Sequence, residues 1–321
     1  MSVVSFFNHK GGVGKTTIVF NTGLAMLDRG HSVVFVDADP QANLTGLAVA
    51  EPDYEQERAD GTTIWAAVSP LVTGAGDIDV PDPVQIRDGA WLLPGDLRLS
   101  NFESILPVGW IEALAGEARG FRTTSALHRL FRALTEKTGA DFVFVDLGPN
   151  VGALNRTALV ASDGFVVPLA PDLFSLMALP SVGNSLREWS RQWKTALSNK
   201  PQTVDFDLPL GKAKPLGYVS QQFSVYGNRP AAAFRHWLDR IADAYSEGIL
   251  DPLGWPGDGK NEMLGSLKNF ASLVPLAQKS NKAIYELSGV EARGAQFTRA
   301  QETRATFEEI ARRIDAGLDD K

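Results

Sequence analysis

The chain has 321 residues, of which 44% are hydrophobic and 21% charged, and its formal net charge is −7. This composition is typical of a globular protein with a large core, and the absence of cysteine excludes disulfides, thiolate metal sites and cysteine nucleophiles. No apolar run reaches the roughly 18 residues that a membrane span needs, and no signal peptide opens the chain, so we expect a cytoplasmic protein.

The negative charge is concentrated in one segment. Residues 51–90 contain nine acidic and two basic residues, whereas the rest of the chain carries 29 of each. The segment is rich in turn-forming residues and has no sustained apolar period, which predicts a surface insertion with a short helix at 62–68. Because the acidity is local, the net charge does not exclude a DNA-binding face elsewhere.

A glycine-rich loop follows the first apolar run. Residues 1–7 predict a strand, and residues 18–27 have the apolar spacing of a helix packed on a sheet. Glycines between them let backbone N–H groups converge at a helix N-terminus, which favours a bound phosphate. In such a loop Lys15 reaches the β- and γ-phosphates and the Thr16 hydroxyl binds Mg²⁺. The predicted nucleotide-binding residues are Gly11, Gly12, Val13, Gly14, Lys15, Thr16 and Thr17.

Carboxylates end two later apolar runs. The run 32–36 is followed by Asp37 and Asp39, and the run 142–145 is followed by Asp146. Buried parallel strands deliver such side chains to the carboxyl edge of a sheet, where ligands bind in α/β folds. Asp146 has the Walker B arrangement, in which a carboxylate holds Mg²⁺ across from the phosphate loop.

The remaining pattern alternates strands with helices. Further strands are predicted at 91–93, 164–168 and 217–222. Helices are predicted at 121–139, 155–161, from about 171 to 197 and at 297–318, and 101–106 and 110–114 are amphipathic. This order predicts an α/β fold with a mostly parallel, twisted sheet and helices on both faces.

The loop departs from the common P-loop at His9, where glycine is expected, and carries a second lysine, Lys10. Lys10-Gly11-Gly12-Val13-Gly14-Lys15-Thr16-Thr17 resembles the deviant Walker A motif of the ParA/MinD ATPases. The segments 37–43 and 146–149 resemble the D-x-D-P-Q-x-N and D-x-x-P motifs of that family. The resemblance covers nearly the whole chain. It implies one P-loop NTPase domain over 1–321, with insertions near 51–90, 198–214 and 246–265, and the Soj-like type without a preceding helix-turn-helix.

The resemblance also implies roles for single residues. Lys10, Lys15 and Asp39 are the expected catalytic residues: Asp39 orients the attacking water, and Lys10 reaches into the site of a second subunit. Asp37 is expected to support Mg²⁺ beside Thr16 and Asp146. Adenine contacts are expected from Gln221 and Gln222, at the end of a strand, and from a loop at 274–280 that contains Pro275, although glutamine at a strand end is usually only solvated.

The cofactors so implied are ATP and Mg²⁺, and the functional unit is an ATP-bound homodimer with slow hydrolysis. A partner protein, ParB-like or a cargo adaptor, is expected to stimulate hydrolysis. The C-terminal helix lacks a basic, bulky tip, so no membrane anchor is expected.

Three outputs fit this switch. The first is DNA partition through non-specific, salt-dependent DNA binding. The second is a protein-interaction switch for a protein cargo, without DNA. The third, a metabolic P-loop ligase or kinase, is disfavoured because those enzymes lack the Lys10 signature. The basic clusters are also what solvated faces look like; the DNA candidates are Arg187, Arg191, Lys194, Lys268, Lys279 and Lys282.

Overall fold

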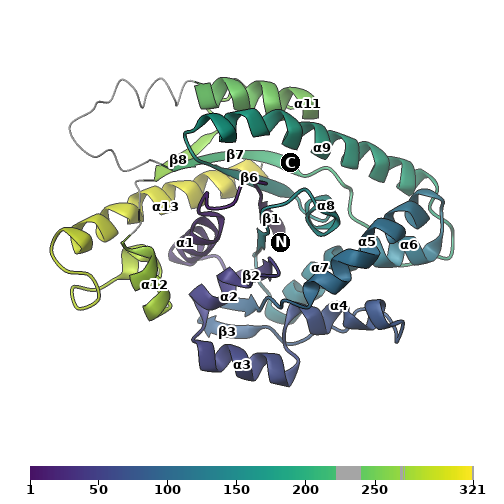
Figure 1. Cartoon of the computed structure of the whole chain (residues 1–321), viewed down its shortest axis with the longest axis horizontal. Helices are drawn as coiled ribbons and strands as arrows, with labels where there is room; N and C mark the ends of the chain where they lie inside the picture. The colour runs from purple at the N-terminus through teal and green to yellow at the C-terminus, as the bar shows by residue number, and fades with distance from the viewer. Residues whose placement is uncertain (222–239, 268–269, 271, 320–321) are drawn as a thin grey trace.

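The computed structural model describes residues 1–221, 240–267, 270 and 272–319 (Figure 1). Within these residues lies one eight-stranded sheet in the order β3-β4-β2-β5-β1-β6-β7-β8, parallel except for the antiparallel pair β3–β4 at one edge. The predicted α/β fold with a mostly parallel sheet is confirmed. The strands are β1 (Ser2–Phe6), β2 (Val33–Ala38), β3 (Val84–Arg87), β4 (Ala90–Leu93), β5 (Phe142–Leu147), β6 (Gly164–Leu169), β7 (Lys214–Gln221) and β8 (Met263–Leu267).

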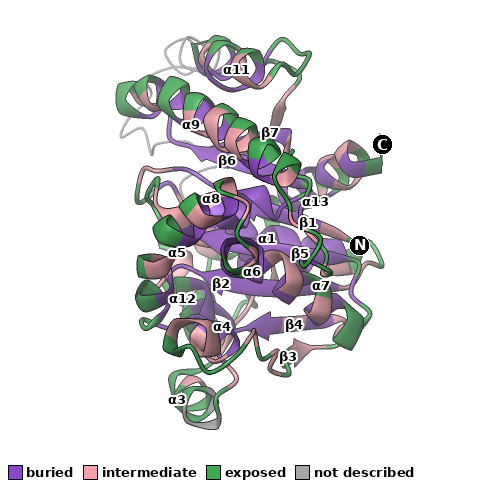
Figure 2. Cartoon of the chain, turned by 90° about the vertical axis from the view of Figure 1, so that its right-hand side faces the viewer, coloured by how far each residue is buried: buried purple, intermediate pink, exposed green. Residues whose placement is uncertain are grey.

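The central strands read as continuous apolar runs because helices cover both faces of the sheet. Successive residues of a strand point to opposite faces. In β2, Val34 and Val36 join one core, whereas Val33 and Phe35 join the other. Figure 2 shows the buried strands running through the middle of the molecule with helices on either side.

Two long helices cover one face. α1 (Lys15–Asp28) follows the glycine-rich loop and packs against α13 (Ala295–Asp319), the predicted C-terminal helix. Phe307, Ile310 and Ile314 of α13 are fully buried in the core that they share with α1. The helix spacing of these residues therefore reported the buried face correctly.

More helices cover the opposite face. They are α4 (Ile64–Thr73), α5 (Leu99–Leu114), α6 (Ala118–Thr124), α7 (Ala126–Thr138), α8 (Ala153–Val160) and α9 (Leu173–Ser198). The predicted helix 121–139 is thus two helices, which meet at Ser125. Its predicted stop at Gly139 is confirmed, because this residue ends α7 with a φ of 71°.

The segment 51–90 is more ordered than its composition predicts. It contains α3 (Glu51–Asp60), α4 and β3, and Ile64, Ala67 and Val68 are fully buried. The predicted short helix at 62–68 is confirmed as the start of α4, whereas the prediction of a surface insertion is wrong there, because this helix packs into the core. In Figure 2, α3 projects from the end of the molecule, away from the sheet.

The segment 246–265 is also partly internal. It forms η1 (Ser246–Leu250), a π-helix, then α11 (Asp251–Leu253) and the start of β8, and it buries Ile249 and Leu250. Among the residues described, no helix is both long and apolar enough to cross a membrane. The short elements not yet named are α2 (Asn43–Ala48), α12 (Val274–Ser280) and η2 (Ile284–Glu286).

Candidate nucleotide-binding site

The glycine-rich loop joins the carboxyl end of β1 to the N-terminus of α1. Gly12 and Gly14 have φ angles of 73° and 71°, in the left-handed region that favours glycine. A Cβ on Gly14 would lie 1.7 Å from the amide nitrogen of Gln221. The Gln221 side chain can move aside, so it is the left-handed φ of Gly14 that disfavours other residues, and the first N–H groups of α1 have no partner within the helix. The loop therefore presents unpaired donors and a helix dipole to one point.

A cleft of about 460 Å³ opens over this loop. The predicted residues Gly11, Gly12, Gly14, Lys15, Thr16, Thr17 and Asp39 line it. The structure adds Gln41 and Asn43, whose motif the sequence showed without marking them as ligand contacts. It also adds Leu47, which no prediction included. Pro149, Val274 and Gln278 line the cleft as well; they lie in the predicted D-x-x-P motif at 146–149 and in the predicted adenine segment at 274–280, but were not marked as ligand contacts.

Asp146 lies behind the cleft lining and is hydrogen-bonded to Thr16, which belongs to that lining. The Thr16 hydroxyl donates to Asp146 Oδ2 at 2.7 Å, and Asp146 Oδ1 is buried without a hydrogen-bond partner among the described residues. Burial raises the pKa of Asp146 to about 8, the charge of Asp37 adds to this, and Thr16 and Lys15 oppose it.

These two groups pass a test for Mg²⁺. An orphaned carboxylate oxygen beside a hydroxyl is a donor set that suits Mg²⁺, which takes few protein ligands and fills its shell with phosphate and water. No three His, Cys, Asp or Glu side chains converge as a metal cluster in the described part of the chain. The residues thus fit a metal held jointly with a nucleotide.

Asp37 is engaged with the protein itself. Its Oδ2 accepts from the Thr45 N–H at 2.8 Å and from the Thr45 hydroxyl at 2.7 Å, and its Oδ1 accepts from the Asp39 N–H at 3.3 Å. Burial raises the pKa of Asp37 to about 7, which hydrogen bonds from Thr45 oppose. The role of Asp37 in supporting Mg²⁺ stays a prediction; the contacts observed are those of a residue that positions α2 and Asp39.

Asp39 and Lys15 face the cleft from opposite sides. Asp39 is nearly buried, and its Oδ1 accepts from the Gln41 N–H at 3.0 Å. Burial lowers the pKa of the Lys15 ammonium, whereas the charges of Asp146 and Asp39 oppose that shift. The structure therefore brings the predicted Lys15, Thr16, Asp39 and Asp146 together around one space.

Lys10 does not join that group. Its ammonium forms an ion pair with Asp172 and lies 3.5 Å from the Ser175 hydroxyl, at the N-terminus of α9. Its N–H donates to Asn8 Oδ1 at 3.0 Å, and the Asn8 amide donates to the Pro168 carbonyl at 2.7 Å. Within one chain, Lys10 is thus held beside its own α9.

The residues predicted to contact adenine are not among the described residues that line the cleft. Gln221 lies against Gly14, behind the loop, and Gln222 lies outside the described residues. Pro275 belongs to the first turn of a helix, α12, so the predicted loop is wrong; proline is compatible with that position because its missing N–H has no partner there anyway. The neighbouring Val274 and Gln278 of α12 line the cleft instead.

The basic candidates fall on two elements. Arg187, Arg191 and Lys194 are exposed at helical spacing along one face of α9, although Arg191 pairs with Glu188 at 2.6 Å. Lys279 is exposed at the end of α12, whereas Lys282 pairs with Glu291 at 2.7 Å. Lys268 lies outside the described residues.

The sheet order and the phosphate loop define a P-loop protein, and sequence comparison agrees. Residues 1–199 match the AAA_31 family model, described as an AAA domain. The sporulation initiation inhibitor protein Soj of Bacillus subtilis is 30% identical over 196 residues, 61% of this chain and 68% of Soj. The chromosome partitioning protein ParA of Caulobacter vibrioides is 31% identical over 180 residues, 56% of this chain and 60% of that protein. The chain belongs to the AAA_31 family and, with these relatives, to the ParA/MinD ATPases.

Solved structures share the fold. Protein DIP2308 from Corynebacterium diphtheriae is 27% identical, with a TM-score of 0.67 over 88% of this chain and 97% of that one. A McdA–ATP complex from Cyanothece, 16% identical, gives 0.62 over 98% and 96%. Cobyrinic acid a,c-diamide synthase from Mycobacterium smegmatis, with a bound ATP analogue and magnesium, is 27% identical and gives 0.51 over 76% and 80%.

Proposed function

We propose that this chain is a Mg²⁺-dependent ATPase whose ATP-bound form is a homodimer. The observation that carries the proposal is the convergence of Lys15, Thr16, Asp39 and Asp146 around one cleft of about 460 Å³. The relatives named Soj and ParA and the neighbour described as an ATP complex support a nucleotide of this kind.

Each residue has a task in this proposal. The loop N–H groups and Lys15 bind the phosphates, and Thr16 and Asp146 hold Mg²⁺, which neutralises charge on the transferred phosphoryl group when bound. Asp39 accepts a hydrogen bond from the attacking water and fixes its direction toward the γ-phosphate. Asp37 keeps Asp39 in place through the hydrogen bond to its N–H.

The slow rate follows from the same geometry. Asp39 is the one carboxylate among the described residues that line the cleft, and no histidine is among them. A positioned carboxylate with no stronger base beside it gives modest proton-transfer catalysis. We therefore propose that a partner protein remodels the site to speed hydrolysis.

The dimer part of the proposal concerns Lys10. In the single chain its ammonium is paired with Asp172, so it must leave that pair to reach a second subunit. The pair is partly exposed, with 31% and 22% of the two side chains accessible, so its loss costs little. ATP would supply the differential contact that favours the dimer.

For the output we propose non-specific DNA binding in partition or intracellular positioning. The face of α9 with Arg187 and Lys194 presents exposed cations, and the relatives named for chromosome partitioning support this choice. The alternative is a protein-cargo switch that does not touch DNA. A biosynthetic ligase is a further alternative, favoured by the synthase neighbour at 27% identity.

The test combines light scattering with DNA mobility shifts. Asp39→Ala should retain ATP, so it should dimerise with ATP but neither with ADP nor without nucleotide. Lys10→Ala should abolish that dimer, whereas Lys137→Ala, which removes an exposed lysine of α7, should leave it intact. A monomer under all conditions would contradict the dimer switch.

The DNA arm separates the alternatives. The dimer should shift duplexes of any sequence and release them in high salt, and the Arg187→Glu, Lys194→Glu double variant should bind more weakly than Lys137→Glu. A dimer that ignores DNA would favour the protein-cargo switch. ATP consumption in step with a stoichiometric organic product would favour the ligase.

A further inference from the structure

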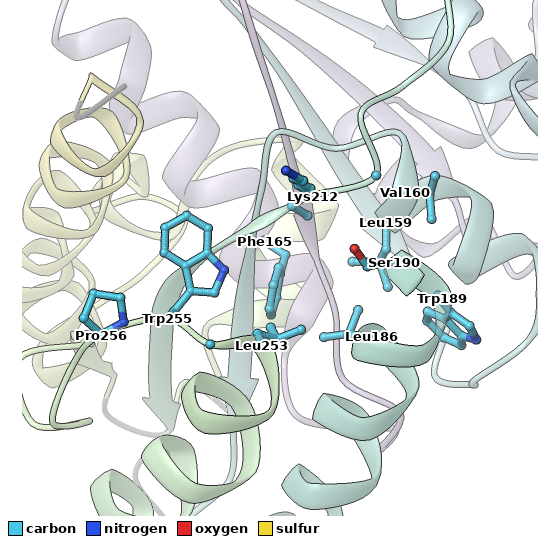
Figure 3. Close-up of a pocket in the computed structure, with 13 residues that line it drawn as sticks. Leu159, Val160, Phe165, Leu186, Trp189, Ser190, Lys212, Leu253, Trp255 and Pro256 are labelled. Carbon is cyan, nitrogen blue, oxygen red and sulfur yellow. The ribbon is translucent and has the colours of Figure 1, made fainter. Parts of the chain in front are cut away.

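A second pocket lies at the opposite edge of the sheet from the phosphate cleft. It has a volume of about 470 Å³ and is built around Phe165, near the amino end of β6, and Lys212, just before β7 (Figure 3). The phosphate loop follows the carboxyl end of β1, which runs parallel to β6. The two cavities therefore occupy different ends of the strands and share no lining residue.

The pocket wall formed by α9 is fixed on the side of η1. A Cβ on Gly183 of α9 would lie 1.8 Å from the carbonyl oxygen of Gly248 in η1. The two backbones thus touch directly, which leaves the segment with Leu253 and Trp255 little freedom to move relative to α9. π-Helical turns such as η1 are frequent at functional sites.

The turn that carries Lys212 is fixed as well. The buried Trp193 indole donates to the Pro209 carbonyl at 2.8 Å. Gly211 has a φ of 68°, and a Cβ there would lie 2.4 Å from the Trp193 ring. Both contacts hold the turn against α9, so the pocket exists before any ligand arrives.

The lining has the character of a small-molecule site. Figure 3 shows Trp255 on one side and Leu186 and Trp189 on the other, with Phe165 and Lys212 between them. Phe165 is fully buried, whereas Trp255 is 36% exposed and forms part of the rim. Ligand pockets are mostly apolar and aromatic with a few polar groups that fix orientation, within about 300–1,000 Å³.

The polar groups define the charge of the ligand. Lys212 forms no ion pair with any residue in the described ranges. The other polar groups on side chains of the lining are the Ser190 hydroxyl and the indole N–H groups of Trp189 and Trp255. Lys214 adds a second cation, 5.8 Å from the centre of the Trp255 ring, although the nearby Glu262 offsets part of its charge. No carboxylate belongs to the lining residues. An anion is therefore the charge that this pocket complements.

We propose that this pocket binds a small organic anion with an aromatic or bulky aliphatic body, independently of the nucleotide. The body packs between Trp255 on one side and Leu186 and Trp189 on the other, and the anionic group pairs with Lys212 and accepts from Ser190. The site does not depend on ATP binding or on dimerisation.

Anilinonaphthalene sulfonate, an aromatic anion that fluoresces when desolvated, is the probe for this site. The full chain should bind one equivalent, and neutral phenylnaphthylamine, which lacks the sulfonate, should bind at least about tenfold more weakly because it cannot pair with Lys212. Equal affinities of the two compounds would overturn the proposal.

Variants place the probe. Ser190→Phe fills the pocket from a half-buried position and should abolish binding, and Lys212→Met should weaken it about tenfold. Lys200→Met, an exposed lysine beyond the end of α9, and Lys15→Ala should bind as the parent does. Loss of binding in Lys15→Ala alone would place the probe in the phosphate cleft and overturn the proposal, as would equal effects of the two Lys→Met variants. Ser190→Phe is compared at equal helicity by circular dichroism, so that misfolding is recognised.

Discussion

The two edges of the sheet carry cavities of nearly equal volume but opposite construction. At the carboxyl edge, backbone N–H groups, a half-partnered Asp146 and a buried Lys15 surround the cleft. At the amino edge, indoles and leucines surround a pocket with one cation at its mouth. A buried polar group without a hydrogen-bond partner lowers the stability of the isolated protein. Such groups are found mainly at functional sites, where a ligand supplies the missing partner. The carboxyl edge therefore indicates its ligand through buried polar groups that lack a partner. The amino edge indicates its ligand through the shape and apolar lining of the pocket.

The largest expected effect comes from Gly14→Ala, which acts on the carboxyl edge alone. The variant places a Cβ at φ 71° beside the Gln221 amide, so it should lower ATP affinity by about 10- to 100-fold, mainly by straining the loop. Isothermal titration with MgATP measures the loss. Gly139→Ala is a matched control, because its φ is also 71° but no atom lies within 4 Å of the new Cβ. Equal ATP affinity in the two variants would contradict a requirement for glycine at position 14 of the loop.

Gly183→Ala makes the corresponding change at the amino edge. Its Cβ would overlap the Gly248 carbonyl oxygen, so α9 and η1 must separate, and overpacking of this kind costs about 1–3 kcal/mol of unfolding free energy. Urea denaturation measures the loss. The same variant should lower the affinity for anilinonaphthalene sulfonate but leave the affinity for MgATP unchanged, because the two cavities lie at different edges of the sheet. A loss of affinity for both ligands would contradict the independence of the two cavities.

The two edges also differ in how much of each could be predicted from the sequence. The strands from β1 to β7, other than β3, were readable as apolar runs, and the phosphate loop and Asp146 were readable because a fixed chemistry requires fixed spacing. Gln41 and Asn43 lay in a motif that was read for its carboxylates only. α12 was read as a loop because the segment resembles the proline-containing loop of the family, although proline is tolerated at the start of a helix.

The amino-edge pocket had no readable signal. Its walls come from α8, β6, α9, the turn before β7 and the segment after α11, which are joined only by folding. An apolar residue that lines a pocket looks the same in a sequence as one that fills a core. The contact that fixes the wall, Gly183 against Gly248, joins residues 65 positions apart, and nothing local announces it.

A third prediction compares two buried carboxylates of the carboxyl edge. Asp96, after β4, accepts hydrogen bonds from Thr63 and from the Arg98 guanidinium, whereas one oxygen of Asp146 has no partner in the described structure. Asp96→Asn should therefore lower the unfolding free energy by about 2 kcal/mol, a value reduced for the 45% exposure of Arg98. Asp146→Asn should leave stability unchanged or raise it by up to about 1 kcal/mol while abolishing ATP hydrolysis.

The pH dependence of unfolding tests the ion pair between Asp96 and Arg98. Burial raises the pKa of Asp96, but the hydrogen bonds and charge of Arg98 outweigh burial, and the net pKa is lowered. A carboxyl whose pKa is lower in the folded state stabilises the protein above the unfolded pKa of about 4, and this stabilisation is lost as the pH falls through the folded value. The stability difference between parent and Asp96→Asn should therefore be full at pH 7 and shrink below pH 4. A difference that grows in acid would contradict the assigned ion pair.

The smallest effect is expected at the point where α9 meets the phosphate loop. Asp172→Asn removes the charge that pairs with Lys10 but keeps an oxygen that can accept from the Ser175 N–H, now at 2.8 Å. Because asparagine is as good an N-cap as aspartate and the pair is partly exposed, stability should fall by less than about 1 kcal/mol. If Lys10 must leave Asp172 to enter a second subunit, the same variant should dimerise at an ATP or protein concentration lower by a few-fold, as measured by light scattering.

Asp172→Ala, which also loses the cap, separates the two roles: it should lose more stability than Asp172→Asn while dimerising as readily. Unchanged or weaker dimerisation in Asp172→Asn would mean that the ion pair with Asp172 does not restrain Lys10.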